Sequence, residues 1–255
     1  MRILCLGCEV VARPLYLCAA HSPHIVDIRL FQRGLHNDPA DLYARLQTEI
    51  DSVAGADAAD GKRYDAIVMA YGLCGKATAG LIAREVPLVI PRAHDCITLF
   101  LGSRERYQDQ FENFPGTYWY ALDYVERDDG SGGPLALGSG SETDLNAVHD
   151  EYVRKYGQDN ADYLMEVMGA WQQHYQRAAL IDMGVGDIAA VEARAQADAA
   201  RRGWTFDRIA GDVVLIHRLL AGDWDGDFLV VEPGEQVHMS YDASVIGCAP
   251  AETVS

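Results

Sequence analysis

Short apolar runs alternate with helical patterns along the first third of the chain. A helix is predicted from Asp38-Pro39, with Asp38 as N-cap and apolar residues following at a 3.6-residue period. Another helix is predicted from about Asp95, with a restart after Gly102. The predicted strands are Arg2–Leu6, Ile25–Leu30, Tyr64–Tyr71 and Pro87–Pro91. Strands separated by helical crossovers predict a parallel sheet with helices on both faces.

The second half of the chain predicts a long helix and then a return of the alternation. Residues 126–142 are Gly-rich and without period, which is typical of a linker or a lid. A helix is expected over about 144–173. The strands expected after it are Ala178–Asp182, Trp204–Ile209 and Phe228–Glu232, with helices beginning after Asp187 and Asp212.

Together these patterns predict an α/β fold with a parallel Rossmann-like or flavodoxin-like sheet, or two α/β lobes joined by a long helix. The predicted division has four parts. They are an N-terminal α/β lobe (1–125), a Gly-rich loop or lid (126–143), a helical segment with a second α/β lobe (144–241), and a loosely held tail (242–255).

The net charge of the chain argues against some classes of binding partner. The 255 residues carry 38 acidic and 21 basic side chains, a formal net charge of -17. Such a surface repels phosphate backbones and anionic membranes, so we expect neither nucleic acid nor a membrane as partner. The first ten residues are typical of a strand rather than a signal peptide. We therefore expect a cytoplasmic protein whose six cysteines are reduced thiols. The oligomeric state stays open.

The six cysteines fall into different sequence environments. Cys5 lies between two leucines of the first strand, and Cys18 lies in an apolar helical stretch. Free cysteine is among the most buried residue types, so both are predicted to be core residues. Cys248 lies in the predicted tail, where it is either inert or a further metal ligand.

Cys8, Cys74 and Cys96 each follow the carboxyl end of a different predicted strand, and His94 shares the loop of Cys96. Ligands of open α/β sheets bind outside these strand ends. In a flavodoxin-like strand order of 2-1-3-4, the three loops are neighbours. Three thiols and one imidazole match a zinc site, with iron or an iron–sulfur cluster as the alternative. The competing interpretation is that these are small buried residues in tight turns beside glycines.

The loop of residues 92–96 offers further chemistry. Cys96 lies in the first turn of the helix that Asp95 opens, where the helix dipole is expected to lower the pKa of the thiol. Asp95 alternatively orients the imidazole of His94. Arg92 is a candidate for binding a carboxylate or phosphate, or else forms a surface ion pair. A metal-free enzyme would use Cys96 as the nucleophile, assisted by His94 or Asp95.

Four segments of the chain resemble one family: YGLCG at 71–75, PRAHDCITLFLGSRERY at 91–107, KYGQDNADYLMEV at 155–167 and FLVVEPGE at 228–235. The family is catalogued as domain of unknown function 1638, and the resemblance covers nearly the whole chain. It implies an association with corrinoid-dependent methyltransferase systems. Within the third segment, Lys155 and Asn160 are candidate ligand contacts, or else they lie on a helix surface. The chain lacks a DxHxxG signature, so we do not expect it to hold base-off corrinoid by itself.

Three functions follow as hypotheses. The first is a metal-binding protein, with zinc held by the cysteine and histidine side chains. It would act in or support methyl transfer and one-carbon metabolism on a small-molecule substrate. The second is the metal-free thiol-dependent enzyme. The third is a non-catalytic accessory protein that docks a corrinoid protein or its activator through the acidic surface.

Overall fold

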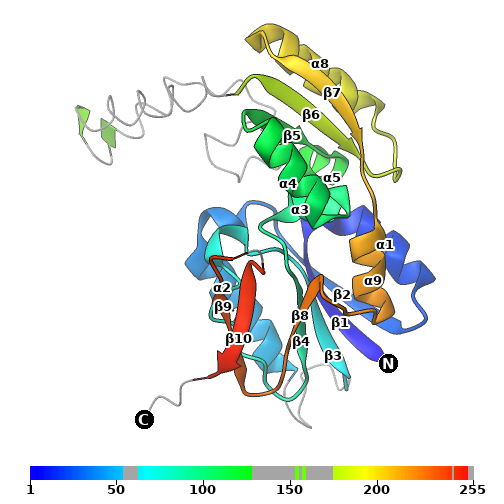
Figure 1. The fold of residues 1–255 in the computed structure, drawn as a ribbon, viewed down its shortest axis with the longest axis vertical. Coiled ribbons are helices and arrows are strands. Elements are labelled where there is room, and N and C mark those ends of the chain that lie inside the picture. Colours follow the sequence, from blue (N-terminus) through cyan, green and yellow to red (C-terminus); the bar gives the residue numbers. More distant parts are fainter. Residues whose placement is uncertain (54–62, 128–152, 155–156, 159–174, 243, 252–255) are drawn as a thin grey trace.

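The fold is built on two sheets, one mostly parallel and one parallel, and helices lie against both (Figure 1). The structure is a computed structural model that describes residues 1–53, 63–127, 153–154, 157–158, 175–242 and 244–251. The predicted Gly-rich segment and the predicted long helix lie almost entirely outside the described residues. Among the described helices, none is long and apolar enough to cross a membrane.

The larger sheet has five strands in the order β2-β1-β3-β4-β8, which includes the predicted order 2-1-3-4. Its first four strands are parallel, whereas β8 pairs with β4 in the antiparallel direction. The central strand β3 is buried at every position, as expected for a parallel strand covered on both faces. The strands are β1 (Arg2–Cys8), β2 (Ile25–Phe31), β3 (Ala66–Ala70), β4 (Leu88–Pro91) and β8 (Phe228–Val231).

Alternate residues of the strands fill two separate cores, one on each face of this sheet. Helix α2 (Pro39–Ser52) covers one face through Leu42, Leu46 and Ile50, and its N-cap is Asp38 as predicted. Helices α1 (Ala12–His21) and α9 (Val214–Ala221) cover the opposite face (Figure 1). The α/β fold predicted from the alternating pattern is thereby confirmed.

The smaller sheet has three parallel strands in the order β5-β6-β7. Helix α8 (Ala189–Arg202) packs against it through Val191, Ala195 and Ala199. Helices α3 (Cys96–Leu101) and α4 (Arg104–Asn113) run between the two sheets, and α5 (Leu122–Glu126) follows β5 (Figure 1). The strands are β5 (Thr117–Tyr120), β6 (Arg177–Asp182) and β7 (Thr205–Ala210).

The strands do not divide between the sheets in sequence order. Strand β5 precedes the Gly-rich segment but pairs with β6, which follows it. Strand β8 lies late in the chain but completes the larger sheet. The chain therefore passes from the larger sheet to the smaller one and back again.

The expectation of a loosely held tail is wrong for residues 246–250, which form a strand, whereas residues 243 and 252–255 lie outside the described residues. Strand β9 (Glu235–Met239) pairs with β10 (Ile246–Pro250) in an antiparallel hairpin. The side chain of Ile246 is fully buried in the same core as α2. Two buried apolar residues, Val245 and Ile246, and a ladder of backbone hydrogen bonds fix this segment, although its composition is small and polar.

Candidate functional site

The carboxyl edge of the larger sheet brings together three cysteines. Cys8 is the last residue of β1, and Cys96 is the first residue of α3, in the loop after β4. Cys74 begins the short 3-10 helix η3 (Cys74–Lys76), which follows β3. Because β1, β3 and β4 are neighbours in the sheet, their three loops lie side by side. We call these three residues the thiol cluster.

The thiols of the cluster are close enough to influence one another electrostatically. Burial raises the pKa of Cys74 to about 12, with further contributions from Cys8 and Asp95. Burial also raises the pKa of Cys96 well above its ordinary value, and Asp95, Cys74 and Cys8 add to that effect. The pKa of Cys8 is raised by burial as well. Each residue keeps part of its surface exposed, so the cluster lies just below the surface.

Backbone contacts hold the loops after β3 and β4 against each other. The N–H groups of Leu73 and Cys74 donate to the carbonyls of Ala93 and His94, at 2.8 and 3.0 Å. A Cβ on Gly72 would lie 2.7 Å from the backbone nitrogen of Asp95, so only glycine fits there. Cys74 has a left-handed backbone with a φ of 45°, which L-residues rarely adopt. Such strained residues cost about 1–3 kcal/mol and cluster at functional sites.

Asp95 fixes the start of α3 as its N-cap. One carboxylate oxygen accepts from the backbone N–H of Ile97 at 2.9 Å, and the other accepts from the hydroxyl of Tyr107 at 3.2 Å. The expected lowering of the Cys96 pKa by the helix is wrong for the protein without metal. Burial and the carboxylate of Asp95 both act in the opposite direction, and together they outweigh a helix of only six residues.

His94 lies in the loop between β4 and Cys96. Its side chain is exposed and stacks on the ring of Tyr107, with 5.8 Å between ring centroids. Tyr107 stacks in turn on Phe111. The imidazole lines an open cleft along α4.

The remaining predicted site residues lie elsewhere. The guanidinium of Arg92 donates to the carbonyl of Ser244 at 3.2 Å and to that of Ile246, so it ties the loop after β4 to the β9–β10 hairpin. Cys248 approaches the carbonyl of Val230 at 3.9 Å. Lys155 and Asn160 lie outside the described residues. Cys5 and Cys18 are 0% and 2% exposed, which confirms the prediction that both are core residues.

Two residues next to the cluster were missed by the sequence reasoning. The pKa of Tyr71 is raised by burial and by the thiols of Cys8, Cys74 and Cys5, which places its hydroxyl beside the cluster. Arg33 is 3% exposed, and its charge lowers the pKa of Cys8. Arg33 follows β2 at the same edge of the sheet, so the strand-end reasoning applied to the cysteines also points to it.

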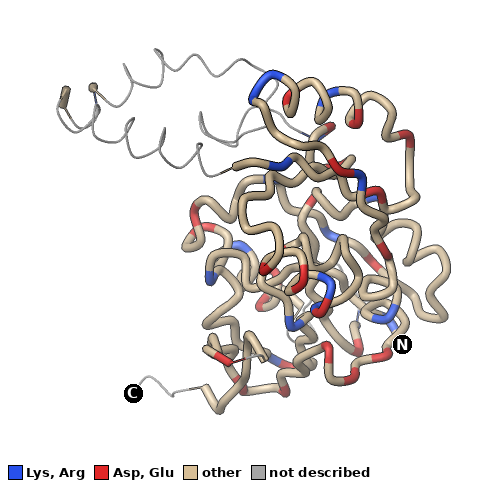
Figure 2. Tube along the Cα trace, turned by 45° about the horizontal axis from the view of Figure 1, so that its top comes forward, with Lys and Arg blue, Asp and Glu red and all other residues tan. Residues whose placement is uncertain are grey.

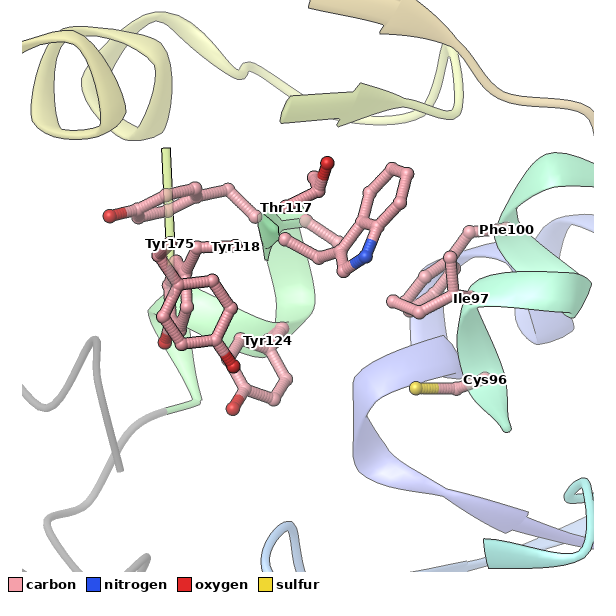
Figure 3. A pocket seen from close by; sticks show the side chains of 10 residues that line it. Cys96, Ile97, Phe100, Thr117, Tyr118, Tyr124 and Tyr175 are labelled. Carbon is pink, nitrogen blue, oxygen red and sulfur yellow. The ribbon is translucent and has the colours of Figure 1, made fainter. Parts of the chain in front are cut away.

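Two cavities adjoin the loop that carries Cys96. The larger, of about 670 Å³, is the polar cleft beside His94, and Arg92, Arg104 and Asp242 are among its lining residues. The smaller, of about 180 Å³, has Cys96 in its wall and aromatic residues of β5 and α5 opposite. Figure 3 shows the sulfur of Cys96 pointing from α3 toward the side on which Tyr124 and Tyr175 lie. We call the smaller one the aromatic cavity.

A family model described as "Protein of unknown function (DUF1638)" matches residues 30–220. The chain belongs to this family. No curated protein and no solved structure matches the chain significantly. Cys74, His94 and Cys96 lie within the matched part of this DUF1638 protein, whereas Cys8 precedes it.

The cysteine sulfurs of this DUF1638 site are donor atoms of the type that thiophilic metals prefer. Thiolates are the softest protein ligands and favour zinc, copper(I) and iron–sulfur clusters. Throughout the described part of the chain, no three His, Cys, Asp or Glu side chains already stand in the positions of metal ligands. What favours a shared site is the placement of the three cysteines after neighbouring strands.

Proposed function

We propose that this protein binds one transition-metal centre, with zinc as the first candidate, through the thiolates of Cys8, Cys74 and Cys96. The observation that carries the proposal is the placement of three cysteines directly after three neighbouring strands of one sheet. Three adjacent thiolates repel one another in a buried place unless a cation compensates them. A metal ion deprotonates its thiol ligands outright and supplies that compensation.

The number of ligands favours a catalytic zinc site over a structural one. Structural zinc sites have four protein ligands, whereas catalytic sites have three and keep one position open. His94 is exposed and stacked on Tyr107, which leaves the three sulfurs as the protein's contribution. Three cysteines also suit an iron–sulfur cluster, which is the alternative metal centre.

A metal with one coordination position open to substrate suits methyl transfer, or a supporting step of one-carbon metabolism, on a small molecule. A bound zinc ion supplies Lewis acidity to a substrate heteroatom. The chain itself contributes a buried positive charge from Arg33 beside Cys8, and Asp95 fixes the helix that begins at Cys96. A corrinoid protein as methyl-group partner is proposed from the family resemblance alone.

Metal analysis of protein purified without a histidine tag tests the proposal. We expect about one equivalent of zinc, or of iron together with acid-labile sulfide. Cys74→Ser and Cys96→Ser should each lower the occupancy by about tenfold or more. Cys248→Ser is the matched control and should leave it unchanged, because its sulfur lies against Val230 on another part of the sheet.

Two results would contradict the metal proposal. The first is less than about a tenth of an equivalent of any transition metal in freshly purified protein. The second is equal metal content in all three cysteine variants. A folded, metal-free protein that still captures a corrinoid protein would instead support the accessory role. Figure 2 shows acidic residues spread over many elements of the described trace, so that association should weaken broadly with salt.

A further inference from the structure

The aromatic cavity lies between α3 and the edge strand β5, and its wall carries no charge. Cys96 and two apolar residues of α3 line one side, and residues 117–121 of β5 and the turn after it line the other. No charged residue belongs to the described part of the wall. Burial raises the pKa of Cys96 well above its ordinary value, so its thiol stays protonated at neutral pH. An ionised ligand would therefore lose its hydration here without an ion-pair partner.

Two charged groups lie close to the cavity, and their signs are opposite. The guanidinium of Arg33 lies 4.9 Å from the ring centroid of Tyr124. The carboxyl group of Asp95 adjoins Cys96 and helps to raise the pKa of its thiol. A cation beside Tyr124 would be repelled by Arg33, and an anion beside Cys96 would be repelled by Asp95. The cavity thus favours a ligand without charge.

The volume sets the size of the ligand. A cavity of about 150 Å³ with apolar walls holds one benzene molecule. The aromatic cavity measures about 180 Å³, which leaves room for one six-membered ring and a short substituent. Tyr118 of the wall already meets Tyr120 and Tyr175 edge to face, at interplanar angles of 74° and 89°. A flat aromatic ring in the cavity would extend this packing.

Trp119 belongs to the wall, and its indole N–H makes no hydrogen bond within the described part of the chain. By contrast, the indole N–H of Trp224 donates to the carbonyl of Leu219 at 2.8 Å. The side chain of Trp119 is half-buried, and its nitrogen stays accessible. An indole N–H donates and cannot accept, so it calls for an acceptor on the ligand.

Other polar side chains of the wall are engaged, buried or weak donors. The hydroxyls of Thr117 and Tyr120 donate to a backbone carbonyl and to a carboxylate, at 2.7 and 3.0 Å. The hydroxyl of Tyr118 is buried. Cys96 offers an S–H group, which is a weak donor. Trp119 is therefore the residue that we expect to orient a polar ligand.

We propose that the aromatic cavity binds a small, uncharged aromatic molecule with one oxygen acceptor, such as a short aryl ketone. The ring packs among the aromatic side chains, and the carbonyl oxygen accepts from the indole N–H of Trp119. This site is independent of the proposed metal centre, because Cys96 contributes to it only as an uncharged part of the wall.

Isothermal titration of the full chain as purified tests this site. The neutral probes are acetophenone and ethylbenzene, which have nearly the same shape but differ in the carbonyl oxygen. The charged probes are benzoate and benzyltrimethylammonium. We expect acetophenone to bind with a Kd at least about tenfold below that of ethylbenzene, because only acetophenone accepts a hydrogen bond. Neither charged probe should bind measurably.

Substitution of Trp119 isolates the contribution of its N–H. Trp119→Phe keeps an aromatic ring in the wall but removes the donor, so the difference in Kd between the two neutral probes should vanish. Trp204→Phe is the matched control. Trp204 packs against the core of the smaller sheet and does not line the cavity, so this variant should keep the difference.

Nuclear magnetic resonance reports on the same hydrogen bond directly. The chain has four tryptophans, and the indole N–H signal that is missing from the nitrogen–proton correlation spectrum of Trp119→Phe identifies Trp119. In the wild type this signal should move downfield when acetophenone is added, because its proton then takes part in a hydrogen bond.

Filling the cavity tests its role in binding. Ala121→Leu places a larger side chain in the wall, and binding of both neutral probes should be lost. Ala189→Leu on the exposed side of α8 is the control and should bind as the wild type does. If Ala121→Leu does not fold, Ile97→Phe fills the cavity from the side of α3.

Several results would overturn this site. They are a failure of acetophenone to bind, binding no tighter than that of ethylbenzene, and tighter binding of a charged probe. A preference for acetophenone that persists in Trp119→Phe, or binding that Ala121→Leu and Ile97→Phe both leave intact, would also overturn it. None of these results bears on the thiol cluster, whose metal content is measured separately and decides the proposed function.

Discussion

The two parallel sheets of this protein share a plan but differ at their carboxyl edges. The larger sheet ends in loops that carry Cys8, Cys74 and Cys96. The smaller sheet contains no cysteine, and Asp182 at the end of β6 forms an ion pair with Arg208 of β7. The same parallel architecture therefore places three thiols at the carboxyl edge of one sheet and charged side chains on the other.

The difference shows that the fold provides a place and the loop residues provide the chemistry. Parallel strands bring successive loops together in both sheets. In the larger sheet Gly72 lets the backbones of the loops after β3 and β4 approach closely. The smaller sheet contributes instead an aromatic edge strand, β5, to the cavity that Cys96 borders. The candidate site thus combines sulfur from one sheet with aromatic rings from the other.

Of the substitutions considered, truncation of Phe100, which packs between the two sheets, should lower the free energy of unfolding most. Its side chain is 2% exposed and belongs to the same buried core as Ile181 of β6. We expect Phe100→Ala to lower the free energy of unfolding by about 3–5 kcal/mol, measured by urea denaturation. Phe111→Ala is the control, because Phe111 is 60% exposed. Equal destabilisation by both variants would contradict the account.

A methyl group at Gly72 tests whether the loops after β3 and β4 of the larger sheet must approach closely. The new Cβ would meet the backbone of Ala93 and Asp95 at 2.8 and 2.7 Å, and backbone atoms cannot turn aside as a side chain can. Gly72→Ala should lower the free energy of unfolding by about 1–3 kcal/mol and also lower metal occupancy. Gly226→Ala, which meets nothing within 4 Å, should change stability by less than about 0.5 kcal/mol. A fully stable, metal-loaded Gly72→Ala variant would contradict this assignment.

Alkylation tests whether the thiol cluster is reactive without metal. Burial raises the pKa of Cys18 and of Cys248 to about 11 and that of Cys74 to about 12. Only the thiolate reacts, so below these pKa values the alkylation rate should rise about tenfold per pH unit. Site-resolved mass spectrometry of chelator-treated, folded protein between pH 7 and 10 measures this. Rapid stoichiometric labelling of Cys96 alone at pH 7 would favour the metal-free enzyme instead.

The ion pair of the smaller sheet should give the smallest effect. A hydrogen bond from Arg208 holds the pKa of Asp182 below its ordinary value of 3.8. A lowered carboxyl pKa in the folded state stabilises the protein above the unfolded pKa, and that contribution is lost as the pH falls through the folded pKa. Arg208→Gln should therefore be slightly less stable than wild type at neutral pH and equal to it in acid. A difference that persists unchanged in acid denaturation curves would contradict this explanation.

The order of the first four strands could be predicted because hydrophobic runs and helical spacing agree over residues 1–101. The antiparallel pairing of β8 could not, since no local pattern states the direction of a distant partner. Strand β5 was missed although Gly116 precedes an aromatic, β-branched run of the kind that favours strands. The β9–β10 hairpin depends on Ile246 reaching a distant core, which composition does not reveal.

The sequence was sufficient to predict which loops of the candidate site lie together, but not how their side chains are oriented. Placement after strand ends brought Cys8, Cys74 and Cys96 together, because topology decides which loops meet. The orientation of His94 was not predictable, since its stacking on Tyr107 depends on α4 lying beside the loop. The pKa of Cys96 depends on burial and on Asp95, and neither is visible in the spacing of residues.

X-ray absorption at the metal edge tests the central claim most directly, because it reports the atoms bound to the metal in the protein as purified. The account predicts a shell of about three protein sulfurs, at about 2.3 Å if the metal is zinc. That shell should be lost in Cys96→Ser and kept in Cys248→Ser. A metal surrounded only by nitrogen and oxygen at about 2.0–2.2 Å would contradict the claim that the thiol cluster is a metal site.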